Sequence, residues 1–81
     1  MPLLTVHCYA ALREAAGARV ELELPAGSTA GELKRAVAEQ LPDHAALVER
    51  SAVAVNRRLV GPTETVGPED EIALLPPVSG G

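Results

Sequence analysis

The two residues that most clearly suggest a chemical function are Gly80 and Gly81, at the end of this 81-residue chain, where Gly81 bears the terminal carboxylate. Neither has a side chain, so this carboxylate can enter a slot that is too narrow for any Cβ atom. A carboxylate is a poor electrophile, because its charge is delocalised and its oxygen is a poor leaving group. Adenylation by ATP removes both obstacles, and the acyl-adenylate then reacts with sulfur to give a thiocarboxylate or with an amine to give an amide.

The residues before this end suit its delivery to another protein. Pro76 and Pro77 form a stiff, extended pair without backbone donors, which we expect to end the last strand. At roughly 3.3 Å per residue, residues 77–81 reach at most about 16 Å, enough to enter an enzyme's pocket. We therefore predict a folded domain at 1–76 and an extended, flexible tail at 77–81. In this tail, access to Gly81 is given by Pro77, Val78, Ser79 and Gly80.

The body that presents the tail is predicted to contain five short strands. Apolar residues alternate with the period of a half-buried strand in segments 4–9, 19–24, 53–55 and 71–74, and a further short strand is expected at 59–60, before Gly61 and Pro62. We expect the first two strands to be antiparallel. Arg57 and Arg58, two adjacent basic residues, are interpreted as part of an exposed turn.

One substantial helix is predicted after the second strand. Thr29 and Glu32 have the spacing of a capping box, and Pro42 ends the helix. Its apolar stripe is formed by Leu33, Val37 and Leu41. Shorter helical turns are expected at 10–17 and 45–50. The fold class is therefore an α+β roll, with this helix on one face of a single sheet.

The composition argues against several classes of function. A net charge of −4, with Tyr9 as the only aromatic residue, argues against binding of nucleic acid by counterion release or base stacking. No apolar stretch approaches the roughly 20 residues that span a membrane, so we expect a soluble, cytoplasmic protein without a membrane partner. The single cysteine, Cys8, is predicted to be a buried structural thiol. His7 and His44 lack the spacing of metal ligands, and we expect no metal and no bound cofactor.

No catalytic constellation is found in the sequence. Ser28, Ser51 and Ser79 lack an evident base, and the glycines form no phosphate-binding loop. Any reaction at Gly81 is therefore expected to use the side chains of a partner.

Three segments make the chain resemble a known family, the small subunits of molybdopterin synthase (MoaD family). They are Tyr9–Glu14, Ala54–Asn56 with Leu59–Val60, and Glu69–Gly81, of which Pro76–Gly81 is the most specific. The resemblance covers the whole chain and implies the β-grasp fold of ubiquitin, with a mixed sheet. It also implies a sulfur carrier that supplies no catalytic side chains, as the sulfur-donating subunit of a heteromeric sulfurtransferase.

The family's activity implies several partners that act one after another. A ubiquitin-activating-like, MoeB-like adenylyltransferase would use ATP to adenylate Gly81, and a persulfide sulfur donor would convert it to a thiocarboxylate. The tail would then enter a MoaE-like large subunit, where sulfur passes to cyclic pyranopterin monophosphate. Carried over by position, Tyr9, Leu59 and Leu75 match apolar residues of the family's partner interface. Tyr9 and Leu75 replace the more usual Phe, and Gly67–Asp70 replaces a turn that usually contains Asp-Gly.

Other roles remain open from the sequence alone. A terminal Gly-Gly also suits a sulfur carrier for thiazole synthesis or tRNA thiolation, or a ubiquitin-like modifier that forms isopeptide bonds. In the last case polymeric chains could grow only through Lys34, the single lysine. A purely structural interaction domain with an inert tail is the remaining alternative.

Overall fold

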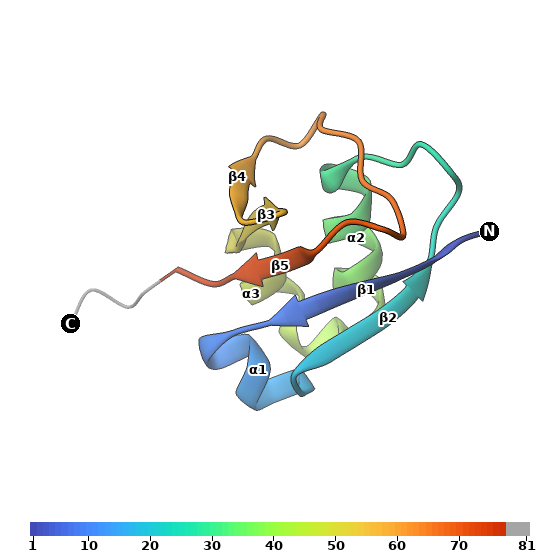
Figure 1. Ribbon diagram of the computed structural model, residues 1–81. Coiled ribbons are helices and arrows are strands. Elements are labelled where there is room, and N and C mark those ends of the chain that lie inside the picture. Colours follow the sequence, from blue (N-terminus) through green and yellow to red (C-terminus); the bar gives the residue numbers. More distant parts are fainter. Residues whose placement is uncertain (78–81) are drawn as a thin grey trace.

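The alternation at the start of the chain produces strand β1, in which Leu4, Val6 and Cys8 are buried as predicted. The computed structural model describes residues 1–77 (Figure 1). Its elements, in chain order, are β1 (Leu3–Cys8), α1 (Ala10–Ala16), β2 (Arg19–Glu23), α2 (Ala30–Gln40), a 3-10 turn (Pro42–His44), α3 (Ala45–Arg50), β3 (Ala52–Val55), β4 (Arg58–Val60) and β5 (Ile72–Leu75).

The five strands form one mixed sheet in the order β2-β1-β5-β3-β4. Strands β1 and β2 are antiparallel, as the sequence predicts, with Leu3 opposite Glu23. The neighbouring strands β1 and β5 are parallel, whereas β3 is antiparallel to both β4 and β5. Because parallel strands end on the same side, the chain leaves β1 and β5 at the same end of the sheet (Figure 1).

The hydrophobic core lies between the sheet and the helices. Helix α2 crosses behind the sheet (Figure 1), and all three helices contribute buried residues to one core cluster. The largest fully buried side chains are Leu4, Val6, Cys8, Leu12, Leu33, Val37, Val48, Ile72 and Leu74. Within residues 1–77, helices pack on this one face only, so the opposite side of the sheet is here called the open face. No helix in this part of the chain is long and apolar enough to span a membrane.

The predicted capping box starts α2. The backbone N–H of Glu32 donates to Thr29 Oγ1 at 3.2 Å, and the backbone N–H of Thr29 donates to Glu32 Oε1 at 2.9 Å. The helix ends at Gln40, one residue before Leu41, but the side chain of Leu41 packs against the core as the predicted apolar stripe requires. Pro42 explains where the helix ends, because the residue before a proline is disfavoured in the helical region, and Leu41 has φ −122° and ψ 66°.

Replacement of Thr29 by Ala is expected to lower the free energy of unfolding by about 1 kcal/mol, because the amide of Glu32 loses its acceptor. Urea unfolding followed by circular dichroism measures this change. Thr29→Ser keeps the hydroxyl and should stay close to wild type. An unchanged midpoint in Thr29→Ala would show that the capping box contributes nothing to stability.

The short elements also follow the sequence, with small shifts at their ends. Helix α1 ends at Ala16 and is followed by Gly17, whose φ of 95° favours glycine, and α3 covers the predicted residues 45–50. Arg58, predicted in a turn, is instead the first residue of β4, since Asn56 and Arg57 alone make a two-residue turn with positive φ angles of 54° and 69°.

The last strand, β5, is followed directly by Pro76 and Pro77. Strand β5 ends at Leu75, directly before the two prolines that are predicted to end it. Pro76 is buried and Pro77 is exposed. Pro76 thus packs as part of the folded body, and the exposed chain starts at Pro77.

Candidate functional site

Of the predicted reactive segment, residues 77–81, the structure describes only Pro77. Val78, Ser79, Gly80 and Gly81 lie outside the described residues, so their predicted role stays a prediction. The structure does show where the chain approaches them. Strand β5 runs between β1 and β3 and delivers Pro77 at the end of the sheet where β1 also finishes.

The three residues predicted at a partner interface come together at this end of the open face. Tyr9, Leu59 and Leu75 line one shallow hollow of about 220 Å³. They belong to three separate parts of the chain, namely the residue after β1, the middle of β4 and the end of β5. Binding of a partner at these residues stays a prediction, but the structure places them on a single surface.

The sheet register explains why they meet. Leu59 is opposite Ala54, which is opposite Ala73, so these side chains form a row across β4, β3 and β5. Cys8 is paired with Leu74, which places the following residues, Tyr9 and Leu75, at the adjacent position. The two alanines are small, and the larger side chains around them therefore leave a hollow.

We call Tyr9, Ala54, Leu59, Ala73 and Leu75 the apolar patch. Leu59 and Tyr9 are 67% and 42% exposed, and they are two of the four large apolar side chains exposed in residues 1–77. Ala54 is only 7% exposed although it lies outside the main core cluster, because its neighbours on the open face cover it. Exposed apolar side chains gathered around a hollow are typical of a docking surface.

Sequence reasoning missed four residues that line the hollow, namely Ala54, Arg57, Glu71 and Ala73. The signal for the two alanines was available, because they alternate with buried Val53, Val55, Ile72 and Leu74 and must face the other side. Their position opposite Leu59 depends on strand register, which the alternation alone does not determine.

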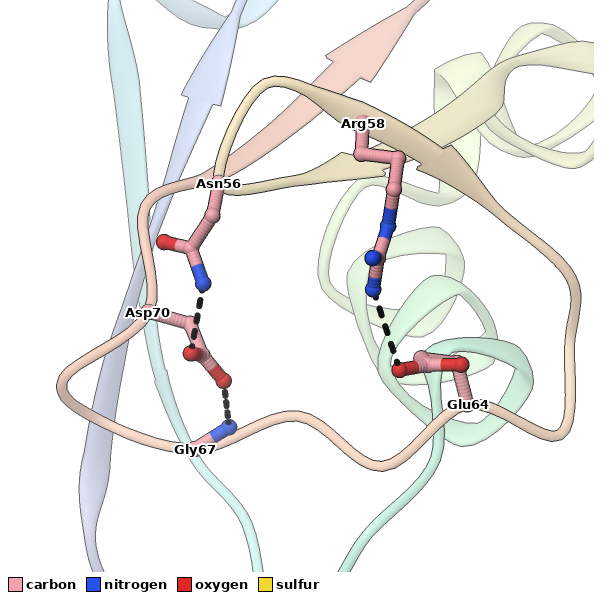
Figure 2. Close-up of polar contacts among 5 residues, drawn as sticks. All are labelled: Asn56, Arg58, Glu64, Gly67 and Asp70. Carbon is pink, nitrogen blue, oxygen red and sulfur yellow. Dashed lines mark hydrogen bonds and ion pairs between the residues drawn. The ribbon is translucent and has the colours of Figure 1, made fainter.

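Two exposed ion pairs border the β3–β4 hairpin. Arg57 Nε lies 3.6 Å from Glu71 Oε1. Arg58 Nη2 lies 3.7 Å from Glu64 Oε2, and Figure 2 shows this second pair. The arginine side chains are 86% and 75% exposed, so water screens both pairs and each contributes little to stability. The Arg57–Glu71 pair nevertheless places charges of both signs at the hollow.

The two buried polar residues of the described chain, Ser28 and Ser51, use their hydroxyl groups in structural contacts. Ser28 Oγ donates to the carbonyl of Pro25 at 2.6 Å, and Ser51 Oγ donates to that of Leu47 at 2.8 Å. Residues 1–77 hold no group of three His, Cys, Asp or Glu side chains that could bind a metal ion.

Cys8 is buried, as predicted, with 2% of its surface exposed. Burial raises the pKa of its thiol above the ordinary value of 9.0, because the thiolate would lose its hydration. The reactive form of a cysteine is the thiolate, so a thiol in this position is a poor nucleophile at neutral pH.

We expect the folded protein to resist thiol-labelling reagents at pH 8 and to react once it is unfolded.

The raised pKa also determines the direction in which stability changes with pH. Above about pH 9 the thiol ionises in the unfolded chain first, so its contribution to stability is present below that pH and is lost as the pH rises. Unfolding of wild type and of Cys8→Ala, compared between pH 7 and pH 10, isolates this contribution. Rapid labelling of the native protein at pH 8 would contradict the burial of the Cys8 thiol.

Comparison with known proteins gives a consistent result. The ThiS family model matches residues 6–81. SAMP1, small archaeal modifier protein 1 of Haloferax volcanii, is 26% identical with a TM-score of 0.81, over 98% of this chain and 99% of that chain. A putative molybdopterin converting factor subunit 1 from Pyrococcus furiosus is 25% identical with a TM-score of 0.80, over 96% of this chain and 100% of that chain.

A further similar structure is the complex of subunits 1 and 2 of molybdopterin-converting factor from Helicobacter pylori. The matching chain is 24% identical with a TM-score of 0.68, over 98% of this chain and 99% of that chain, and this likeness shows the fold alone. These likenesses confirm the predicted ubiquitin-like β-grasp roll.

Proposed function

Because the chain belongs to the ThiS family of ubiquitin-like sulfur carriers, we propose that it is the sulfur-carrying small subunit of a molybdopterin synthase. The observation that carries this proposal is the apolar patch at the end of the sheet where β5 leads toward the terminal glycines. A carrier needs a surface that docks and a chain end that reacts, and the apolar patch lies at the end of the sheet where β5 delivers Pro77, from which the chain continues to Gly81.

The proposed chemistry takes place at the carbonyl carbon of Gly81. Its carboxylate attacks ATP on an activating enzyme, which forms an acyl-adenylate and releases pyrophosphate. A persulfide sulfur then displaces AMP and forms an acyl disulfide with the donor. A second thiolate of the activating system attacks the donor-side sulfur, so that a disulfide forms on the donor side and the thiocarboxylate leaves on the carrier. Glycines at positions 80 and 81 keep Cβ atoms out of the narrow route to the reacting carbon.

The acceptor partner is proposed to be a MoaE-like large subunit. The Helicobacter pylori complex joins a chain of the same fold to a second subunit, which supports this assignment. The apolar patch would be covered on docking, and the tail would enter the partner, where sulfur passes to cyclic pyranopterin monophosphate. Two turns of the carrier are needed for the two sulfurs of the dithiolene. The partner supplies the catalytic side chains, since residues 1–77 assemble none of their own.

Genetic complementation tests this function against other sulfur carriers. Expression of the chain should restore molybdenum cofactor in a strain that lacks the small subunit of molybdopterin synthase. Parallel strains that lack the carrier for thiazole synthesis or for tRNA thiolation serve as controls. Rescue of only one of those control strains would reassign the chain to that pathway.

A second candidate is a protein modifier, which the similarity to SAMP1 favours. The same acyl-adenylate would then react with lysine amines of other proteins. The chain's only lysine is a poor acceptor for a second copy, because Lys34 Nζ donates to the carbonyl of Ser51 at 2.9 Å and is partly buried. We expect single attachments rather than polymers in this case. Mass spectrometry of proteins from cells that express the chain would detect a branched remnant that ends in Gly-Gly on target lysines.

A further inference from the structure

The turn between β3 and β4 is tied to the start of β5 by one side chain that the proposed function does not use. Asn56 is the first residue of this turn and has a positive φ of 54°. Its backbone N–H donates to the carbonyl of Glu71 at 2.8 Å, and its Oδ1 accepts the backbone N–H of Glu71 at 2.9 Å. Asn56 therefore binds both the N–H and the carbonyl group of the Glu71 backbone.

The remaining donor of the same side chain reaches the adjacent loop. Asn56 Nδ2 donates to Asp70 Oδ1 at 3.0 Å, and Asp70 Oδ2 accepts the backbone N–H of Gly67 at 2.8 Å (Figure 2). The loop is closed further by the N–H of Asp70, which donates to the carbonyl of Gly67 at 3.1 Å. The carboxylate of Asp70 thus links the hairpin turn to the loop that leads into β5.

These bonds matter for the apolar patch because β4 is a short edge strand, which is otherwise held by its pairing with β3, by the partly buried Val60 and by the exposed Arg58–Glu64 ion pair. Strand β4 contains three residues at the edge of the sheet and is paired only with β3. Leu59 is 67% exposed, so packing does little to fix its position. The hollow nevertheless requires Leu59 and Arg57 from the hairpin to face Glu71, Ala73 and Leu75 from β5.

We propose that Asn56 is a positioning residue of the docking surface, which fixes the β3–β4 hairpin against the start of β5 and so places Leu59 and Arg57 in the arrangement that a partner binds. This inference rests on the proposed function, because it assumes that the apolar patch is the docking surface. Asn56 acts through the hairpin, and its amide is already occupied by Asp70 and Glu71.

The first test is the Asn56→Gly variant. Glycine accepts the positive φ of this turn but lacks the side chain, so the backbone conformation is retained and the side-chain bonds are lost. The partner is the purified large subunit of molybdopterin synthase from the same cell, and calorimetry gives the dissociation constant. We expect Kd to rise about tenfold, because the hairpin then spends only a fraction of its time in the competent arrangement. Amide hydrogen exchange in β4 should accelerate in the free protein.

The second test exchanges the two side chains. Asn56→Asp alone places a carboxylate against Asp70 and removes the donor, and it should weaken binding as Asn56→Gly does. In the double variant Asn56→Asp with Asp70→Asn, the amide at position 70 donates to the carboxylate at position 56. The acceptors for the N–H groups of Glu71 and Gly67 are kept, and so is the net charge. The double variant should bind with nearly the wild-type Kd.

Two controls separate the possible outcomes. Thr29→Ala is destabilised at the start of α2, away from the patch, and should leave Kd unchanged at a temperature where the protein is folded. Wild-type affinity in Asn56→Gly, or no recovery in the double variant, would overturn the inference. An equal loss of affinity in Thr29→Ala would also overturn it, since stability alone would then explain the effect. If Leu59→Glu binds like wild type, the docking surface of the proposed function itself is wrong.

Discussion

Removal of Gly81 is expected to abolish sulfur transfer while leaving the folded body unchanged. The deletion moves the terminal carboxylate back by one residue, roughly 3.3 Å along an extended chain. A displacement of about 1 Å at a reacting group costs up to 100-fold in rate, so the loss here should be at least about 100-fold. The core lies within residues 1–77, and the free energy of unfolding should change by less than about 0.5 kcal/mol.

The measurement uses the reconstituted synthase. The deletion variant and wild type are incubated with ATP, the activating enzyme, the sulfur donor, the large subunit and cyclic pyranopterin monophosphate, and the sulfurated product is quantified. Urea unfolding of both proteins is the control for folding. Sulfur transfer at the wild-type rate by the shortened chain would show that the tail is inert and would favour a purely structural interaction domain.

The second large effect is expected from Leu59→Glu. Leu59 is exposed in the free protein, so its replacement should change the stability little, whereas docking would bury the new carboxylate against an apolar surface. We expect the dissociation constant for the large subunit to rise about 100-fold, which corresponds to about 3 kcal/mol.

Leu3→Glu is the matched control for this variant. Leu3 is 53% exposed and also lies on a strand face opposite the core, but it belongs to the beginning of β1, away from the apolar patch. The two variants make the same chemical change and add the same charge. Equal weakening by both would mean that general electrostatic repulsion, rather than the apolar patch, governs docking.

The local features of the fold were predictable from the sequence because they depend on neighbouring residues. The capping box of Thr29 and Glu32 and the glycine at the end of α1 are examples, since their spacing alone defines the contact. The alternation of Leu4, Val6 and Cys8 likewise indicated which face of β1 is buried.

Features that depend on strand order were less accessible. The hollow between Leu59 and Leu75 exists because Ala54 and Ala73 stand side by side, and this pairing follows from the register of β3, β4 and β5. Tyr9, Leu59 and Leu75 were named through the family resemblance, which carried information on register that periodicity lacks. The contacts of Asn56 with Asp70 and Glu71 were hidden for the same reason, because they join residues far apart in the sequence.

The central claim, that Gly81 carries the sulfur, is tested most directly by intact-mass spectrometry. The chain is incubated with ATP, its activating enzyme and a persulfide sulfur donor, and a sample without ATP serves as the control. We expect an ATP-dependent mass gain equal to the exchange of one oxygen for one sulfur, located at Gly81 by fragmentation. An unchanged mass with active partners, or a sulfur located at Cys8, would contradict it.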